Sequence, residues 1–261
     1  MSLRVLLSYL GVYRIYRRWL RRQIRSGEMP RHVGVILDGN RRWALSRSLA
    51  PWEGHRRGAS KVEEFLRWCI ELGIRMVTLY VFSTENFQRP RREVEELMRI
   101  AEENFDKVLK SELIHKNGVC VRAIGRIHLL PENLRGLINR VEEATKLYDK
   151  FYLNLAIAYG GRAEIIDAVK AISAGVARGE ISPEEIDEEY FGRFLYTSYL
   201  PQQDPDLIIR TSGECRLSGF LLWQSAYSEL FFIDVYWPEF RDIDLYRAIR
   251  SFQQRNRRFG R

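Results

Sequence analysis

Cysteine is scarce in this chain of 261 residues, with only Cys69, Cys120 and Cys215. Their number is odd, they lie far apart, and none has metal-ligand spacing, so we expect free thiols and a reducing compartment rather than disulfides or a zinc site. No uninterrupted apolar run approaches the ~20 residues of a membrane span. Arginines interrupt the only segment that could serve as a signal peptide. The sequence therefore predicts a cytoplasmic protein with its own hydrophobic core.

Acidic residues are absent from the beginning of the chain, where the first is Glu28. Seven arginines precede it, so they account for seven of the eight net positive charges and leave +1 for residues 28–261. A protein that binds nucleic acid would carry its basic residues across a face of the folded body. The charge distribution therefore predicts no nucleic-acid partner.

Residues 1–27 form a separate N-terminal segment in this interpretation. Aromatic and leucine residues recur at helical spacing within residues 3–25, with arginines between them, which predicts a basic amphipathic helix. Two interpretations remain open at this point. The helix lies peripherally on an anionic membrane surface through residues 1–25, or it packs on the domain and exposes its arginines to water.

Residues 28–261 alternate between strand-like and helix-like segments, and most of the strands are continuous apolar runs. Such runs are typical of strands covered on both faces. Apolar residues at helical spacing predict helices over 58–72, 91–115 and 162–178. The alternation predicts one α/β domain with a mainly parallel central sheet of about six strands flanked by helices. The expected strands are residues 32–37, 76–82, 119–125, 151–158, 206–210 and 231–236.

Charged and small residues follow the first and fifth expected strands. Asp38 and Gly39 follow one of them, and Arg210 ends the other, with Arg216 a few residues later. Open α/β sheets bind ligands at the carboxyl ends of their strands. Arginine grips phosphate oxygens, and Mg²⁺ bridges phosphate to one or two carboxylates, so the pattern indicates a magnesium-bound polyphosphate. Asp38 as a helix cap is the plainer alternative, and Asn40 argues against an Asp-x-Asp phosphatase.

Other polar residues offer weaker signals. The segment from Ser83 to Arg89 follows the second expected strand and brings hydroxyl, carboxylate and amide groups, although a capped turn explains it equally well. His55 opens the first long helix and would lie beside a bound anion if that helix end faces the site. Glu229, just before the last expected strand, is of interest only as a second carboxylate for a metal held by Asp38.

Taken together, these motifs closely resemble those of the cis-prenyltransferases, the undecaprenyl diphosphate synthase family. The resemblance runs through nearly all of residues 30–260, in the expected order. No Asp-Asp-x-x-Asp motif of the unrelated trans-prenyltransferases occurs. The motifs are Asp38-Gly39-Asn40-x-Arg42-Trp43, Gly54-His55-x-x-Gly58, Phe82-Ser83-x-Glu85-Asn86, Tyr159-Gly160-Gly161-Arg162, Asp206-Leu207-Ile208-Ile209-Arg210-Thr211, Arg216-Leu217-Ser218-x-Phe220 and Arg257-Arg258-Phe259-Gly260.

The resemblance implies a homodimeric enzyme that adds isopentenyl diphosphate repeatedly to an allylic diphosphate. It implies that Mg²⁺ is held by Asp38 and Glu229, and that an apolar tunnel for the growing chain runs beside the helices at 58–72 and 91–115. Arg42, with the amides of Gly39 and Asn40, would bind the allylic diphosphate. The diphosphate of isopentenyl diphosphate would be bound by Arg210, Arg216 and Ser218, with Arg258 and Gly260 reaching in from the partner. Asn40, His55, Ser83, Glu85 and Asn86 would line the reacting centre, with Arg41, Trp43, Phe87 and Arg89 as further substrate contacts.

Several departures from the common bacterial pattern point to an archaeal or eukaryote-like branch. Many bacterial members have an arginine about where this chain has Pro51. Phe87 stands where tryptophan is frequent in the family, and Ala158 stands where asparagine is frequent. The starter, farnesyl or geranylgeranyl diphosphate, and the product length stay open. The main alternative is a non-catalytic accessory subunit of a heteromeric enzyme. Such subunits tend to lose the catalytic aspartate and phosphate-binding arginines, whereas this chain keeps Asp38 and Arg210.

Overall fold

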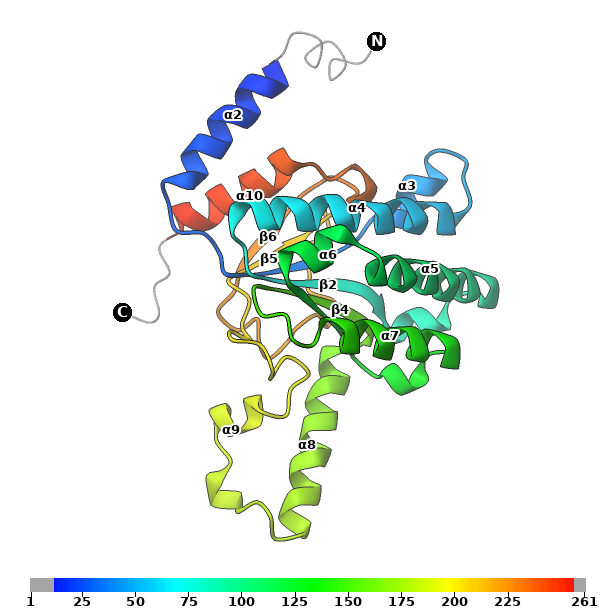
Figure 1. Ribbon diagram of the computed structural model, residues 1–261, viewed down its shortest axis with the longest axis vertical. Helices are drawn as coiled ribbons and strands as arrows, with labels where there is room; N and C mark the ends of the chain where they lie inside the picture. Colours follow the sequence, from blue (N-terminus) through cyan, green and yellow to red (C-terminus); the bar gives the residue numbers. More distant parts are fainter. Residues whose placement is uncertain (1–11, 256–261) are drawn as a thin grey trace.

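The computed structural model describes residues 12–255 and contains one six-stranded sheet in which every neighbouring pair of strands is parallel (Figure 1). The order β3-β4-β2-β1-β5-β6 places β1 beside both β2 and β5. This confirms the predicted α/β class and the number of strands. The strands are β1 (His32–Ile36), β2 (Met76–Ser83), β3 (Val119–Ile124), β4 (Phe151–Tyr159), β5 (Leu207–Arg210) and β6 (Glu229–Phe232).

The helices alternate with these strands along the first two thirds of the chain. The helix expected over 58–72 begins earlier, at Pro51, and the one expected over 91–115 divides in two near Ser111. The α-helices are α2 (Val12–Arg25), α3 (Asn40–Leu45), α4 (Pro51–Leu72), α5 (Arg91–Leu109), α6 (Glu112–Asn117), α7 (Glu132–Thr145), α8 (Gly161–Ala177), α9 (Glu188–Gly192) and α10 (Asp242–Gln254).

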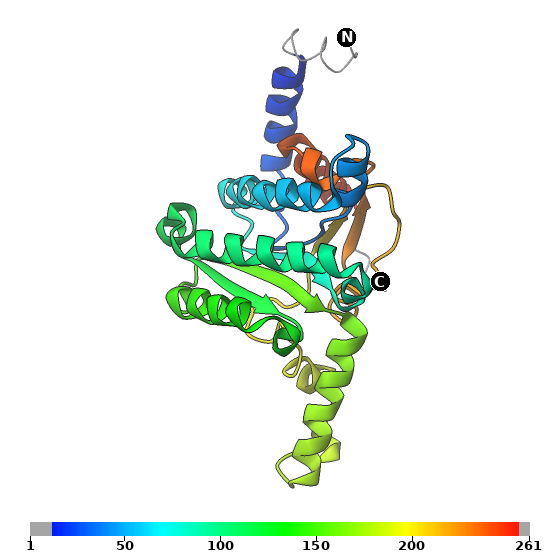
Figure 2. The same cartoon turned by 90° about the vertical axis from the view of Figure 1, so that its right-hand side faces the viewer.

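Successive residues of a strand point to opposite faces of the sheet, and a core cluster covers each face. Val33 and Val35 belong to the larger core cluster, to which α4, α5, α7 and α10 contribute, whereas Ile36 and Tyr80 belong to a smaller cluster on the other side. The smaller cluster is closed by irregular chain that includes Phe220. Figure 2 shows α4 and α5 stacked over one face, with α8 extending away from the body.

An apolar cavity of about 890 Å³ lies between the sheet and helices α4, α5 and α6. Its walls include Leu66 and Ile70 of α4 and Leu97 and Ala101 of α5, and Leu155 of β4 closes it on the sheet side. The cavity occupies the place expected for an apolar tunnel. Its far rim is polar, with charged side chains from α4, α5 and α6.

Helix α2 packs on the domain through one face. Leu20 and Ile24 are fully buried, and Arg250 of α10 lies over the Trp19 ring, 5.0 Å from its centroid. Val12 and Ile15 stay exposed. Residues 12–25 thus pack on the domain through one face and expose another, whereas the part of the predicted helix before Val12 lies outside the described residues. Within the described part of the chain, no helix is long and apolar enough to cross a membrane.

Candidate active site

Asp38 lies at the carboxyl end of β1 and faces Arg210 at the end of the neighbouring strand β5. Its Oδ2 is 2.8 Å from Arg210 Nη2, and its Oδ1 accepts a hydrogen bond from the Gly39 amide at 2.6 Å. Burial alone raises the pKa of the Asp38 carboxyl, but hydrogen bonds from Arg210 and Ser212 and the charge of Arg210 outweigh it, so the pKa lies below its usual range. Asp38 is therefore ionised at neutral pH.

The turn after Asp38 depends on glycine. Gly39 has φ of +96°, and a Cβ at this position would lie 2.6 Å from Cδ1 of Tyr236. A residue with a side chain would meet both a strained backbone and a steric clash there. Thr211 fixes the same turn from β5, because its hydroxyl accepts from the Asp38 amide at 2.9 Å and donates to the Asp38 carbonyl at 2.7 Å.

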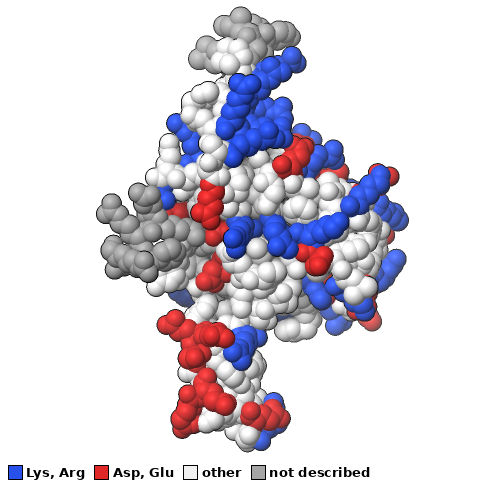
Figure 3. Space-filling view, turned by 60° about the vertical axis from the view of Figure 1, so that its left-hand side comes forward, with Lys and Arg blue, Asp and Glu red and all other residues white. Residues whose placement is uncertain are grey.

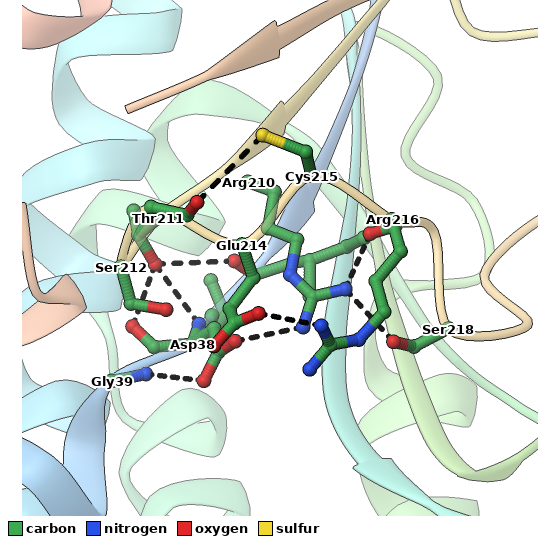
Figure 4. Close-up of polar contacts among 12 residues, drawn as sticks. Asp38, Gly39, Arg210, Thr211, Ser212, Glu214, Cys215, Arg216 and Ser218 are labelled. Atoms are coloured by element: carbon green, nitrogen blue, oxygen red, sulfur yellow. Dashed lines mark hydrogen bonds and ion pairs between the residues drawn. The ribbon is translucent and has the colours of Figure 1, made fainter. Parts of the chain in front are cut away.

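Three arginines and two carboxylates form a connected group around this turn. Figure 4 shows Arg210 and Arg216 of this group with Asp38 and Glu214. Arg42 Nη2 lies 3.4 Å from Asp38 Oδ1 and donates to Ser212 Oγ at 2.5 Å. Glu214 joins Arg42 at 3.2 Å and Arg216 at 2.5 Å. The Arg210 side chain is only 5% exposed. The arginines predicted to bind phosphate are thus brought together, as the sequence suggested.

Arg210 is held in a bent position by the loop after Glu214. Its Nη1 donates to the Arg216 carbonyl and to Ser218 Oγ, the latter at 2.8 Å. Ser218 has φ of +50°, a backbone conformation that a non-glycine residue seldom adopts. The loop thus places the Ser218 hydroxyl beside the guanidinium that it was expected to assist.

A pocket of about 1030 Å³ opens at this edge of the sheet and collects most of the predicted residues. The Ser83 amide donates to Asn86 Oδ1 at 3.1 Å, a capping arrangement that orients the start of the short helix after β2. The buried Asn40 Oδ1 has no hydrogen-bond partner among the described residues and packs against Gly58 of α4, where a Cβ would lie 2.3 Å from it. Predicted residues that line the pocket are Asp38, Gly39, Asn40, Arg41, Arg42, His55, Ser83, Glu85, Asn86, Arg89, Arg210 and Ser218.

His55 is neutral in this pocket. Burial and the charges of Arg89 and Arg41 lower the pKa of His55 to about 3. Its Nε2 lies 3.4 Å from Arg89 Nη1, and Glu93 pairs with both arginines, at 3.2 Å to Arg89 and 3.4 Å to Arg41. His55 therefore serves as a hydrogen-bonding group, not as an acid that changes charge near neutral pH. It lies inside α4 rather than at the helix opening, because that helix begins at Pro51.

Three predicted contacts take other places. Glu229 is the first residue of β6, paired with Leu207 at the opposite edge of the sheet, and its carboxylate binds Arg255 at 2.6 Å. Since β6 is parallel to β5, its first residue lies at the amino ends of the strands, and the structure does not bring Glu229 to Asp38 within one chain. Trp43 lies under Arg47 and Phe87 packs on Phe82, and neither lines the pocket. Arg258 and Gly260 lie outside the described residues.

Sequence reasoning assigned no role to Tyr80 and Glu214. The Tyr80 hydroxyl donates to the carbonyls of Tyr159 at 3.3 Å and Ser218 at 3.4 Å, so it joins β2 to the loop that carries the arginines. Arg162, which was noted only as part of a motif, lines the pocket at the start of α8. The pattern of an aromatic residue inside an apolar strand gives no sign that its hydroxyl reaches the site.

The donor set is consistent with Mg²⁺ carried by a phosphate. Asp38 is ionised and lies in the pocket, and no group of three or more acidic, histidine or cysteine side chains suited to a metal occurs among residues 12–255. Mg²⁺ commonly binds through one or two carboxylates together with substrate phosphates and water. The described residues therefore fit a metal that arrives with its substrate better than a metal held by protein ligands alone.

The charged pocket and the apolar cavity share Leu37, Asn40, His55, Val81 and Phe82. A ligand that fills both spaces has an anionic head and a hydrocarbon tail. The fold and the site thus define a protein that handles phosphorylated lipids at the carboxyl edge of a parallel sheet.

The family profile described as "Putative undecaprenyl diphosphate synthase" matches residues 36–260, and the chain belongs to this family of prenyltransferases. A curated relative, the tritrans,polycis-undecaprenyl-diphosphate synthase (geranylgeranyl-diphosphate specific) of Methanopyrus kandleri, is 56% identical over 98% of this chain and 94% of its own length. The enzyme of the same name from Methanocaldococcus jannaschii is 55% identical over 96% and 90%. These archaeal relatives confirm the expected archaeal affinity.

Solved structures agree. Lavandulyl diphosphate synthase from Lavandula x intermedia, solved with dimethylallyl diphosphate, has a TM-score of 0.86 and 38% identity over 89% of this chain and 99% of that one. A probable undecaprenyl diphosphate synthase from Campylobacter jejuni has a TM-score of 0.72 and 33% identity over 90% and 99%. The chain is a prenyl diphosphate synthase, a transferase that elongates a prenyl chain with cis geometry. The accessory-subunit alternative is not supported.

Proposed function

We propose that this enzyme condenses isopentenyl diphosphate repeatedly onto geranylgeranyl diphosphate and releases a long polyprenyl diphosphate. The observation that carries the proposal is the junction of the arginine-rich pocket with the 890 Å³ apolar cavity. The starter is taken from the names of the archaeal relatives, which specify geranylgeranyl diphosphate. Farnesyl diphosphate, the other starter that the sequence suggested, becomes the comparison substrate.

The residues of the pocket divide between two diphosphates in this proposal. Arg42, with the amides of the Gly39–Asn40 turn, binds the allylic diphosphate, and Arg210, Arg216 and Ser218 bind the other. Asp38 would hold Mg²⁺, which when bound offsets negative charge that develops on the leaving diphosphate. Arg42, which Ser212 holds through Nη2, would stabilise that charge on the allylic diphosphate as it develops.

The bond changes balance without a further reactant. The double bond of isopentenyl diphosphate attacks the allylic carbon as its carbon–oxygen bond breaks, and inorganic diphosphate leaves. A proton is then lost from the carbon beside the new cation, which restores one double bond. Asn40 Oδ1, unpartnered among the described residues, and neutral His55 face this junction and orient the reacting groups.

The cavity favours elongation over the formation of a short product. Each added unit buries about five carbons, or roughly 4 kcal/mol at ~0.8 kcal/mol per methylene group. The growing chain is therefore retained while Leu66, Leu97 and other apolar walls still offer contact. Release of the product should be slow in buffer and faster when detergent or a bilayer accepts the hydrocarbon.

The proposal is tested by incubating the protein with Mg²⁺, labelled isopentenyl diphosphate and either geranylgeranyl or farnesyl diphosphate, with and without detergent. We expect a ladder of long products, a higher kcat/KM with geranylgeranyl diphosphate, and loss of the ladder in Asp38→Ala. Equal use of both starters would refute the starter assignment alone. Incorporation of only one unit would refute repeated elongation.

Peripheral membrane contact through residues 1–25 is a further part of the proposal. Arginines gather on α2 at one end of the molecule, whereas the region of α8 and α9 at the other end is largely acidic (Figure 3). Val12, Ile15 and Trp19 are exposed on α2, at 44%, 69% and 43%. An exposed apolar stripe beside arginines suits the surface of an anionic bilayer.

This part is tested with vesicles that contain anionic lipid. Removing residues 1–27 would expose the core contacts of Leu20 and Ile24, so single substitutions are the better tool. Ile15→Asp should weaken sedimentation with vesicles several-fold, whereas Leu147→Asp, at a site 87% exposed beyond α7, should leave it unchanged. Equal vesicle binding by both variants would contradict membrane contact through α2.

Homodimerisation is proposed on the family resemblance and on exposed apolar residues near the sheet edge. Among the described strands β3 and β6 are the edge strands. Exposed apolar side chains occur in the segment before β6 and on α8, namely Tyr227, Trp223, Ile166 and Val169. Large exposed apolar side chains that cluster mark protein interfaces. Sedimentation equilibrium should give a dimer that Tyr227→Asp weakens, and a monomer at all concentrations would refute it.

A further inference from the structure

Glu214 is a charged residue of the site for which the proposed reaction has no use. It lies in the loop after β5, and Figure 4 shows its side chain among Asp38, Arg210 and Arg216. Its Oε1 is 3.2 Å from Arg42 Nη1, and its Oε2 is 2.5 Å from Arg216 Nη1. One carboxylate thus occupies two guanidinium groups at once.

The two arginines that Glu214 holds serve different ligands in the proposed function. Arg42 belongs to the allylic diphosphate and Arg216 to isopentenyl diphosphate. A carboxylate and a phosphate compete for the same guanidinium donors, because both accept in the same planar geometry. Neither diphosphate can make its full set of contacts while Glu214 remains in place.

The loop allows the carboxylate to leave without disturbing the arginine that is buried. The Ser212 and Gly213 amides donate to the carbonyls of Val235 at 2.8 Å and Ile233 at 3.0 Å, so the chain is anchored just before Glu214. Arg210 is held by Asp38, by Ser218 and by the backbone carbonyl of Arg216, and it has no ion pair with Glu214 among the described contacts. The side chain of Glu214 is 29% exposed, so water is available to solvate it once it is displaced.

We propose that Glu214 is a displaceable internal counter-ion that couples the binding of the two diphosphates. The inference rests on the proposed function, since it requires two diphosphates. Glu214 is a positioning residue in this role, because it acts through Arg42 and Arg216 and need not touch the reacting atoms.

The coupling follows from like-charge repulsion. The first diphosphate to arrive takes one arginine and brings negative charge close to the Glu214 carboxylate, which then also leaves the other arginine. The second diphosphate finds that arginine free and binds more tightly. The coupling is reciprocal, so either substrate promotes binding of the other by the same factor. In the free enzyme the two contacts of Glu214 hold Arg42 and Arg216 in place and offset part of their positive charge.

The experiment measures dissociation constants by calorimetry in the presence of Mg²⁺. The probes are isopentenyl diphosphate and an unreactive allylic thiolodiphosphate, each titrated alone and with the other ligand saturating. Glu214→Gln keeps the size and removes the charge. Glu239→Gln is the matched control, because Glu239 pairs with Arg47 at 2.5 Å on the surface and does not line the pocket.

Glu214→Gln should bind each probe alone about five-fold more tightly, the scale expected when a partly exposed carboxylate no longer competes. The factor by which one probe tightens the other should fall by about the same amount. Glu239→Gln should resemble the unmodified enzyme in both measures.

Weaker binding of both probes to Glu214→Gln would overturn the inference, because Glu214 would then be arranging the arginines or attracting the metal. An unchanged coupling factor would overturn it as well. These failures differ from failure of the proposed function, which would appear as no binding of either diphosphate by the unmodified enzyme.

Discussion

The charged pocket and the apolar cavity meet at five shared residues, yet they are built in opposite ways. In the pocket, Asp38, Arg42, Arg210 and Glu214 satisfy one another through ion pairs that a ligand must replace. In the cavity, side chains such as Leu97 form walls that have no charged partners to exchange. Changes of charge should therefore alter affinity and rate, whereas changes of size should alter the product. The predictions below test that division.

The largest effect is expected at the centre of the pocket. Asp38→Asn removes the charge that pairs with Arg210 and that would hold Mg²⁺, while keeping the shape of the side chain. We expect kcat/KM for the first addition to fall by roughly 10²- to 10³-fold, the usual cost of losing one preorganised electrostatic group.

Steady-state rates with labelled isopentenyl diphosphate measure this loss, with Asp149→Asn on the surface as control. A ratio within ten-fold of the unmodified enzyme would show that Asp38 lies outside the reacting centre.

A change of size in the cavity should alter chain length with little effect on the first step. Ala101 lines the cavity from α5, and phenylalanine at this position would block part of it. We expect the main product of Ala101→Phe to be shorter by one or more five-carbon units, with the rate of the first addition within about two-fold of normal.

Chromatography of the products against length standards measures this shift. Ala144→Phe, at an exposed position of α7, is the control and should give the normal distribution. If Ala101→Phe makes products of the normal length, this part of the cavity does not hold the growing prenyl chain.

Cys215 probes the pocket chemically, because it lies between Glu214 and Arg216 and is exposed. Burial raises the pKa of the Cys69 and Cys120 thiols, so these two should react more slowly with an alkylating reagent. We expect one equivalent of label to lower turnover several-fold and bound diphosphate to slow the labelling.

Mass spectrometry locates the label, and Cys215→Ser gives the insensitive control. An enzyme that stays fully active after stoichiometric modification of Cys215 would contradict the prediction.

The smallest effect is expected from pH at the boundary between pocket and cavity. Burial and two arginines lower the pKa of His55 to about 3, below the ordinary imidazole value of 6.5. On passing from pH 8 to pH 5 a free imidazole gains a proton, whereas His55 stays neutral because the whole range lies above its pKa. The profiles of kcat/KM for the unmodified enzyme and His55→Gln should therefore have the same shape, and an ionisation near pH 6 that disappears in the variant would contradict this.

The sequence predicted the centre of the site well because parallel strands impose it. Asp38 and Arg210 follow two buried apolar runs, and the carboxyl ends of parallel strands meet at one edge of a sheet. The adjacency of β1 and β5 brings the two side chains into contact. The separation of Glu229 from Asp38 within one chain also follows from the parallel sheet. Glu229 pairs with Leu207 at the amino ends of the strands, whereas Asp38 and Arg210 stand at the carboxyl ends.

Other contacts depend on the folded loops and have no signature in sequence. Glu214 reaches Arg42 across 172 positions, and Tyr80 reaches the Ser218 carbonyl across 138. Ser212, before Glu214, and Ser218 both have left-handed backbone. L-residues seldom adopt this conformation, and the sequence of these segments does not predict it. The division of the helix near Ser111 was likewise hidden, because apolar spacing continues across the break.

The shared carboxylate at the end of β1 has a consequence for processive synthesis. In the proposed reaction, the diphosphate that remains on the elongated chain is the one that entered on isopentenyl diphosphate, beside Arg210. Before the next cycle it has to pass to Arg42. Asp38 contacts both Arg210, at 2.8 Å, and Arg42, at 3.4 Å. In the proposed reaction the diphosphate therefore moves between neighbouring donors and is not released and bound again. In this proposal the hydrocarbon then advances by one unit in the cavity, and its diphosphate stays within the same cluster of charged residues.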